Sequence, residues 1–95
     1  MITIESLKET ISKLAGKYSI TKVNLFGSYA DGTANESSDI DLLVEFETKN
    51  VSLLKLSALK IEISEEMENE VDIVHGPLSE KSLLDIKKVI QIYEQ

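Results

Sequence analysis

Two segments decide the fold: Leu25-Phe26-Gly27-Ser28-Tyr29-Ala30-Asp31-Gly32 and, after a polar loop, Ser38-Asp39-Ile40-Asp41-Leu42-Leu43-Val44-Glu45-Phe46. The first begins as a short apolar run and turns at Gly27, a residue that allows a sharp bend and the close approach of a ligand to the backbone. Ser28 is predicted to start a short helical segment, where free backbone N–H groups favour an anion such as phosphate. The first segment therefore predicts a phosphate-binding turn.

The second segment carries two aspartates one residue apart. Because side chains alternate faces along a strand, Asp39 and Asp41 are predicted to share one face while Ile40 points to the other. Two neighbouring carboxylates repel each other unless a cation lies between them, and hard oxygen ligands suit Mg²⁺. A phosphate-binding turn beside paired carboxylates indicates a site for a nucleotide and a metal ion.

Composition narrows the class of protein. The chain has 95 residues, which predicts one domain over residues 1–95, and 42% of them are hydrophobic, enough for one modest core. The net charge is −7 and every basic residue is lysine, so direct nucleic-acid binding is not expected. There is no cysteine, no apolar run of membrane-spanning length and no visible signal peptide, which together favour a cytoplasmic protein without membrane contact.

The remaining patterns predict a small α/β (α+β) fold, in which helices pack on a three-stranded mixed sheet. An amphipathic helix is expected to begin after Thr3 and to stop near Gly16. Strands are expected over residues 21–26, 39–46 and 70–75. A second helix, over residues 51–67 with Ser52 as its cap, is expected to bury Leu53, Leu56, Leu59 or Lys60, Ile63 and Met67. A last helix, beginning at Leu78 or Ser79, is expected to bury Leu83, Ile86, Val89, Ile90 and Tyr93.

The spacing of the central motif has a known counterpart. Gly27-Ser28, ten residues and then Asp39-Ile40-Asp41 resembles the signature of minimal nucleotidyltransferase (MNT) domains of the DNA polymerase beta superfamily. The chain looks most like the small stand-alone MNT domains that serve as antitoxins in HEPN/MNT toxin–antitoxin pairs. The resemblance covers nearly the whole chain and implies the nucleotidyltransferase fold, which is similar to the palm of polymerase beta.

The resemblance also implies a chemistry. Gly27 and Ser28 would hold the β- and γ-phosphates of ATP or another nucleoside triphosphate. Asp39, Asp41 and, on the third strand, Asp72 would be the catalytic acids and would hold two Mg²⁺ ions, which clamp the attacking and leaving oxygens. The reaction would move a nucleoside monophosphate, AMP from ATP, to a hydroxyl. The implied acceptor is a tyrosine of a helical HEPN-type toxin, which the modification would silence.

One position departs from the pattern and leaves other functions open. Domains of this kind often carry a basic residue after Gly-Ser-x-Ala, where this chain has Asp31, and Lys22 and Lys49 are candidate substitutes. A domain with a weak or inactive site could instead neutralise its partner by occlusion. A third alternative is a small-molecule nucleotidyltransferase that works with a separate helical subunit.

Overall fold

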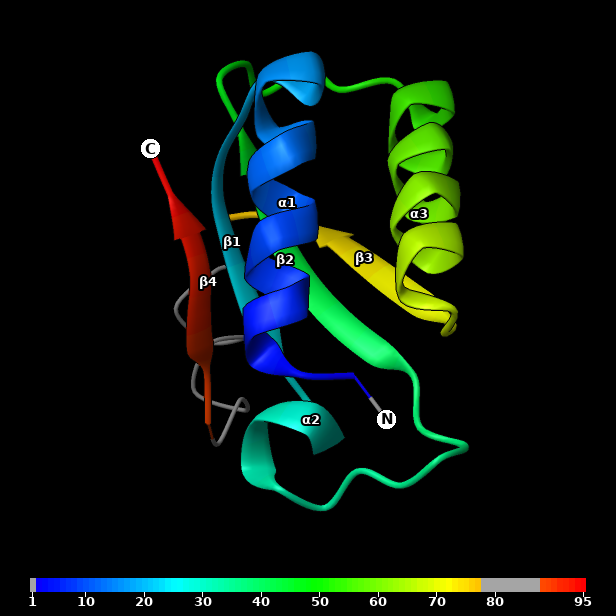
Figure 1. Cartoon of the computed structure of the whole chain (residues 1–95). Coiled ribbons are helices and arrows are strands. Elements are labelled where there is room, and N and C mark those ends of the chain that lie inside the picture. The colour runs from blue at the N-terminus through cyan, green and yellow to red at the C-terminus, as the bar shows by residue number, and fades with distance from the viewer. Residues whose placement is uncertain (1, 78–87) are drawn as a thin grey trace.

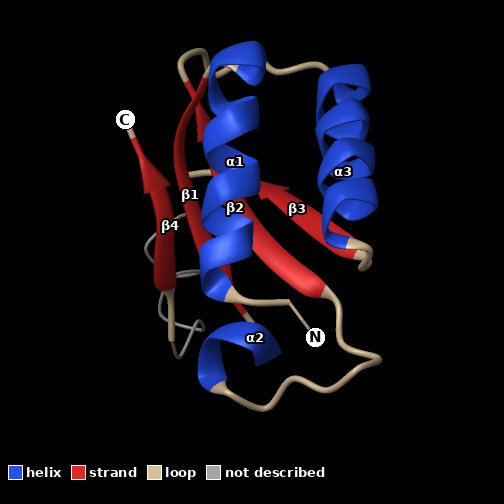
Figure 2. Cartoon of the chain, viewed as in Figure 1, coloured by secondary structure: helices blue, strands red, loops and turns tan. Residues whose placement is uncertain are grey.

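A four-stranded mixed sheet with two long helices on one face forms the described part, residues 2–77 and 88–95, of this computed structural model (Figure 1). Figure 2 shows α1 and α3 together on one face of the sheet and the short α2 at one end of it. The elements follow the order α1 (Ile4–Tyr18), β1 (Ile20–Phe26), α2 (Ser28–Asp31), β2 (Ile40–Phe46), α3 (Leu53–Met67), β3 (Val71–His75) and β4 (Ile90–Glu94).

The strands lie in the order β3-β2-β1-β4, which makes β1 and β2 the central pair. β1 is antiparallel to both β2 and β4, and β2 is parallel to β3. A parallel pair needs a crossover connection, and α3 supplies it between β2 and β3. This topology brings the C-terminal end of β1 and the N-terminal ends of β2 and β3 to the same end of the sheet.

The cap of α1 agrees with its sequence, but the predicted stop does not. The Thr3 side chain accepts a hydrogen bond from the Ser6 backbone N–H, and Ser6 completes a capping box. The helix is predicted to stop near Gly16, and α1 continues two residues further, to Tyr18. The residue that takes the left-handed conformation ending the helix is Ser19, with φ 56°.

The second long helix, α3, starts as predicted. The Ser52 side chain accepts a hydrogen bond from the Lys55 backbone N–H and caps it. Its inward-facing stripe consists of the fully buried Leu59 and Ile63 and the half-buried Leu56 and Met67, which pack against the core. Leu53, predicted to be buried, is 81% exposed. Three residues turn an α-helix by about 300°, so Leu53 is rotated roughly 60° from Leu56. That rotation carries its side chain away from the sheet.

The core lies between the sheet and the two long helices. Its fully buried members include Leu7 and Ile11 of α1, Val23 and Leu25 of β1, and Leu42 of β2. Leu43 on the opposite face of β2 is also buried, at 4% exposure, so this strand is covered on both faces at its centre. In the described residues no helix has both the length and the apolar character to cross a membrane.

The prediction of a three-stranded sheet ending in a helix is wrong at the C-terminus. Residues 78–87 lie outside the described part, and Ile90–Glu94 forms the strand β4 instead of a helix. Ile92 is buried and its neighbours Gln91 and Tyr93 are not, so the segment has the two-residue period of a strand. Pairing with β1 satisfies backbone groups along the edge of that strand, which outweighs the weak helical spacing. Val89, expected to be buried, is 43% exposed.

Candidate active site

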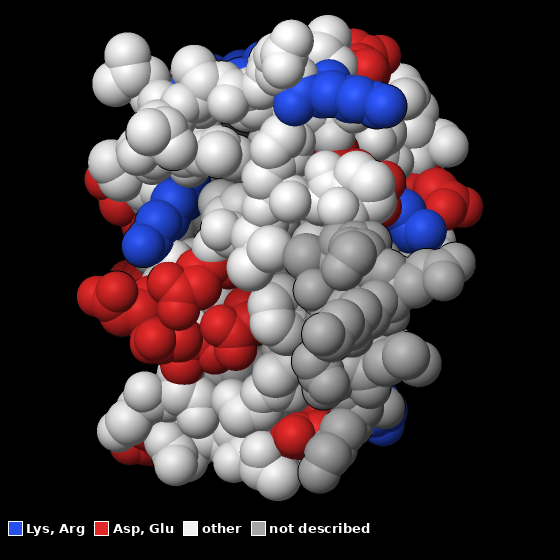
Figure 3. All heavy atoms as spheres, turned by 180° about the vertical axis from the view of Figure 1, so that it is seen from behind, with Lys and Arg blue, Asp and Glu red and all other residues white. Residues whose placement is uncertain are grey.

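Two of the predicted acids are direct neighbours in the sheet. Asp41 on β2 is in register with Asp72 on β3, and the strands are parallel. The preceding pair in the ladder, Ile40 and Val71, is buried in the core under the helices. Because side chains alternate along each strand, Asp41 and Asp72 project from the opposite face. Figure 3, a view from behind, shows acidic side chains gathered on this face.

The third acid, Asp39, precedes β2 by one residue and lies two residues before Asp41, so it belongs to the same side of the sheet. Its charge acts on Asp41, as does that of Asp72. The structure therefore brings together all three of the acids predicted from the sequence.

The predicted phosphate-binding turn is in contact with this cluster. Phe26, the last residue of β1, pairs with Asp41, and Gly27 follows directly. Gly27 has φ 74° and ψ −154°, a backbone conformation that side chains other than hydrogen rarely permit. A Cβ atom placed on Gly27 would lie 2.3 Å from Oδ2 of Asp41. Only glycine leaves room for this carboxylate, and Ser28 then starts α2 beside it.

The electrostatics of Asp41 reflect this crowding. Partial burial is the main cause that raises the pKa of Asp41 above its ordinary value, and the charges of Asp72 and Asp39 raise it further. Withdrawal from water and two like charges both disfavour the ionised form. A site with this property gains from a positive charge placed among the carboxylates.

One lysine already lies next to the cluster. Nζ of Lys60, on α3, is 3.6 Å from Oδ1 of Asp72. Among residues 2–77 and 88–95, no three acidic or histidine side chains are arranged so that they could hold a single metal ion. The sequence left open whether residue 59 or 60 faces the core; Leu59 is buried, and Lys60, one position on, reaches Asp72. Only the crossover geometry of α3 over β3 places this lysine at the site.

Comparisons with known proteins identify the family of the chain. Residues 8–95 match the family described as "Polymerase beta, Nucleotidyltransferase". The chain belongs to this family. The prediction of a minimal nucleotidyltransferase domain is confirmed by the similarity to a solved structure described as a putative minimal nucleotidyltransferase. That structure is 32% identical, covers 94% of this chain and 95% of its own, and superposes with a TM-score of 0.74.

Two further proteins are similar to this nucleotidyltransferase. A protein of Methanocaldococcus jannaschii, named a putative protein adenylyltransferase, is 36% identical over 87% of this chain and 93% of its own length. A solved complex contains a tri-AMPylated HEPN toxin from Shewanella oneidensis with an MNT antitoxin. It matches with a TM-score of 0.71 over 98% of this chain and 74% of that chain, and at 20% identity it shows the fold alone.

The lysines proposed to replace the missing basic residue of the nucleotidyltransferase do not lie at the turn. Lys22 precedes Gly27 by five strand residues, roughly 16 Å, and its Nζ is 3.8 Å from Oε2 of Glu94. Lys49 follows the far end of β2, whereas Asp41 stands near its beginning. The suggestion that either lysine substitutes at the site is wrong, because both lie at the opposite end of the strands. Asp31 ends α2 and accepts hydrogen bonds from the backbone and side chain of Thr33.

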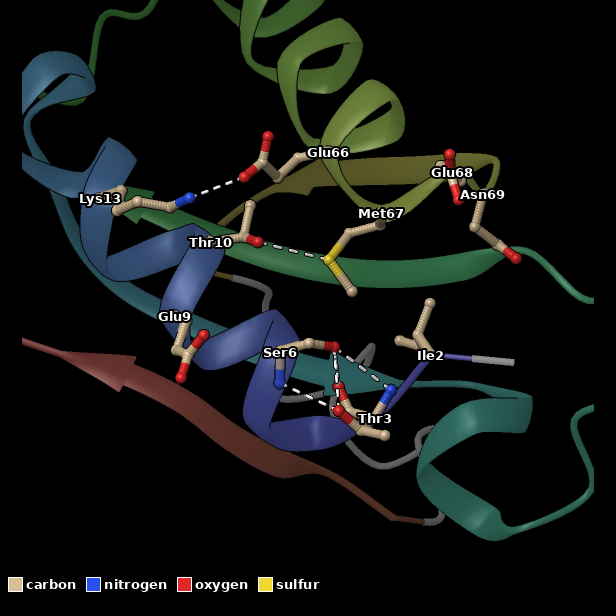
Figure 4. Close-up of a pocket in the computed structure, with 10 residues that line it drawn as sticks. All are labelled: Ile2, Thr3, Ser6, Glu9, Thr10, Lys13, Glu66, Met67, Glu68 and Asn69. Atoms are coloured by element: carbon tan, nitrogen blue, oxygen red, sulfur yellow. Dashed lines mark hydrogen bonds and ion pairs between the residues drawn. The ribbon is translucent and has the colours of Figure 1, made fainter.

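A large hollow of the nucleotidyltransferase lies away from the acids. A groove of about 550 Å³ opens between the first half of α1 and the end of α3, and Figure 4 shows its lining. Thr10 donates a hydrogen bond to the Met67 sulfur, and Lys13 forms an ion pair with Glu66 at 2.6 Å. None of the predicted site residues lines this groove, and it lies on the helical side of the sheet. The carboxylate cluster, which combines acids and a glycine turn, is the better candidate for chemistry.

Proposed function

We propose that this nucleotidyltransferase is an antitoxin that transfers AMP from ATP to a tyrosine hydroxyl of a helical HEPN-type partner. The chain is similar to a protein named an adenylyltransferase. Its fold is shared with an MNT antitoxin solved in complex with an AMPylated HEPN toxin. The cytoplasm is the proposed place of action, because ATP and the proposed partner would meet there.

The contact between the turn and the acids carries the proposal. Gly27, which Ser28 follows at the start of α2, stands against Asp41, and Asp41 in turn is in register with Asp72. A triphosphate held at the turn would therefore have its phosphates beside the carboxylates. In phosphoryl-type transfer, positioning and neutralisation of charge supply most of the catalysis. Gly27 and Ser28 are proposed to orient the triphosphate through the backbone of the turn.

The three acids are proposed to hold Mg²⁺, as a pair of ions. Carboxylate oxygens are the ligands that this cation prefers, and a cation among them would counter the burial and like charges that raise the pKa of Asp41. Bound Mg²⁺ would neutralise the phosphate charge and make the acceptor hydroxyl more acidic. Asp39 and Asp41 would bind from β2. Asp72 would exchange its ion pair with Lys60 for the metal, so that Lys60 becomes free to face the nucleotide.

An acceptor on a protein surface suits the exposure of this cluster. The Asp39 and Asp72 side chains are exposed, and the hollow that includes Asp72 is a shallow groove of about 220 Å³ between α3 and β3. A tyrosine presented by a partner can approach such an open face. The partner would supply the walls that exclude water from the reaction.

Label transfer tests the proposal directly. The purified chain is incubated with Mg²⁺ and ATP labelled at the α-phosphate, alone and with the protein encoded beside it, and the proteins are separated on a gel. We expect label on a tyrosine of the partner with the wild type and with Glu9→Gln, an acid on α1. Asp41→Asn should abolish the label. Equal labelling by Asp41→Asn would refute the assigned site.

Neutralisation by occlusion is a second candidate, and Asp31 favours it. Asp31 follows Ala30 close to the turn, and its negative charge would repel a triphosphate bound there. The same experiment separates the two functions. A stable complex without label on either protein would support occlusion, and label on an added small-molecule hydroxyl alone would support the small-molecule alternative.

A further inference from the structure

The outer side of α3 carries an apolar ridge. Leu53, Leu54 and Ile61 are 81%, 84% and 55% exposed, and in the described residues Val89 is the one other large apolar side chain of this exposure class. Leu54, Ala58 and Ile61 follow each other at steps of four and three, which places them on one side of the helix, here called the α3 ridge. Leu59 and Ile63, which are fully buried, mark the opposite side.

The charges of α3 run against its own dipole. Its first turn has no acid and its last turn no base, whereas Glu62, Glu65, Glu66 and Glu68 gather at its C-terminal end. Acids are favourable at a helix N-terminus and unfavourable at a C-terminus. Glu62 and Glu66 are compensated by Lys17 and Lys13 of α1. For Glu65 and Glu68, no ion pair is formed within residues 2–77 and 88–95.

We propose that the α3 ridge binds a second copy of this chain, with the two α3 helices antiparallel across a two-fold axis. If the helices cross near Ser57 and Ala58, Leu54 of one copy lies opposite Ile61 of the other, on both sides of the axis. The small side chains at the crossing allow the helices to approach closely. An interface of this type is self-complementary, as a two-fold axis requires.

The charge pattern selects this orientation. Antiparallel packing brings Glu65 of each copy close to the N-terminus of the other α3, which is the positive end of the helix dipole, and keeps the Glu68 side chains of the two copies apart. Parallel packing would instead place both glutamate clusters together. Exposed charge that is unfavourable within one chain thus becomes favourable in the pair.

The dimer would leave the carboxylate face of the candidate active site open, although Ser57, near the crossing, also lines the shallow groove beside Asp72. The acids project from the face of the sheet opposite to α3, so each copy could still receive a partner there. One helix of 15 residues, about 22 Å long, makes an interface at the small end of the known range. The association is therefore expected to be reversible and to depend on protein concentration.

Sedimentation equilibrium of the full chain, without nucleotide, tests this interface over about 5 to about 500 µM, the range that suits weak interfaces. The wild-type mass should rise with concentration toward that of a dimer. Leu54→Glu and Ile61→Glu should remain monomeric throughout. Val89→Glu, the same chemical change at an exposed position outside α3, should dimerise like the wild type. Circular dichroism confirms that each variant is folded.

A second variant tests the orientation. Glu65→Lys removes the attraction to the neighbouring helix N-terminus and should weaken association by about five- to tenfold, as expected for a helix-dipole contact. A wild-type chain that stays monomeric at the highest concentration overturns the proposal, even if the ridge binds a different protein. Dimerisation of Leu54→Glu with wild-type strength also overturns it, as does an equal loss in Val89→Glu.

Discussion

Replacement of Gly27 by alanine tests the contact between the turn and Asp41. The new Cβ would lie 2.3 Å from Oδ2 of Asp41 and 3.2 Å from its Cγ, so the carboxylate has to move. The backbone conformation, φ 74° and ψ −154°, is also one that alanine adopts only with strain, at a cost of about 1–3 kcal/mol. The added methyl group therefore destabilises the fold in two separate ways, through the clash with Asp41 and through backbone strain.

Two other glycines separate these penalties. Gly16 has an ordinary helical backbone, and a Cβ added there would meet nothing within 4 Å, so Gly16→Ala should stabilise the fold by about 0.5–1 kcal/mol. Gly32 has φ 83° and the same free space, so Gly32→Ala should cost about 1–2 kcal/mol from the backbone alone. Gly27→Ala carries the backbone cost and the clash, and we expect a total of about 3–5 kcal/mol. In a domain of this size that lowers the melting temperature by well over 10 °C, at about 4–8 °C per kcal/mol.

Urea unfolding at neutral pH without metal measures these differences, and a double variant isolates the clash. Asp41→Ala removes the carboxylate that the new methyl group meets, so Gly27→Ala should cost at least about 1 kcal/mol less in that background. The reasoning fails if Gly27→Ala costs no more than Gly32→Ala and its effect is additive with Asp41→Ala.

Three further predictions concern the acids and the core. Asp41→Asn should stabilise the metal-free protein at neutral pH: burial and neighbouring acids raise the pKa of Asp41, so the wild type loses stability as the pH rises through that value. Urea titrations from about pH 3 to about pH 7 should show this advantage vanishing in acid, and an advantage that grows in acid contradicts the assignment. Mg²⁺ at ten times its dissociation constant should stabilise the wild type by about 1.4 kcal/mol and so raise its melting temperature. The rise should be smaller in Asp39→Asn. If the melting temperature of neither protein changes, the result counts against the metal site. Leu59→Ala should lower the free energy of unfolding by about 2–5 kcal/mol, because the Leu59 side chain is fully buried. Leu54→Ala, on the same helix, should change it by no more than about 0.5 kcal/mol in thermal unfolding of dilute protein. Similar losses in the two variants would refute the orientation of α3.

The local patterns were sufficient for most of the secondary structure. The apolar spacing before Tyr18 and between Leu56 and Met67 predicted both long helices, and the caps at Thr3 and Ser52 are confirmed. These signals act between residues only a few positions apart, so they can be read without knowing the fold. The catalytic and metal-binding roles of the acids stay predictions, although the structure places the acids together.

The failures have a common cause in long-range contacts. The apolar spacing of residues 90–94 fits a helix and a strand about equally. Pairing with the edge of β1 makes the segment the strand β4. Leu53 fits the helical stripe of α3 at its margin, but the angle at which the helix lies on the sheet turns it outward. The local spacing alone left both choices open.

For this protein the amino-acid order by itself determined which residues form the candidate site: a glycine turn and a pair of aspartates at a set distance, with the strand period that places those aspartates on one face. Only the tertiary structure decided which groups surround them. The parallel pairing of β2 with β3 set Asp72 beside Asp41, and the antiparallel pairing with β1 pressed Asp41 against Gly27. The α3 crossover brought Lys60 to Asp72. Strand register and helix placement follow from burial of the whole core, and residues distant in the chain meet only when that core forms.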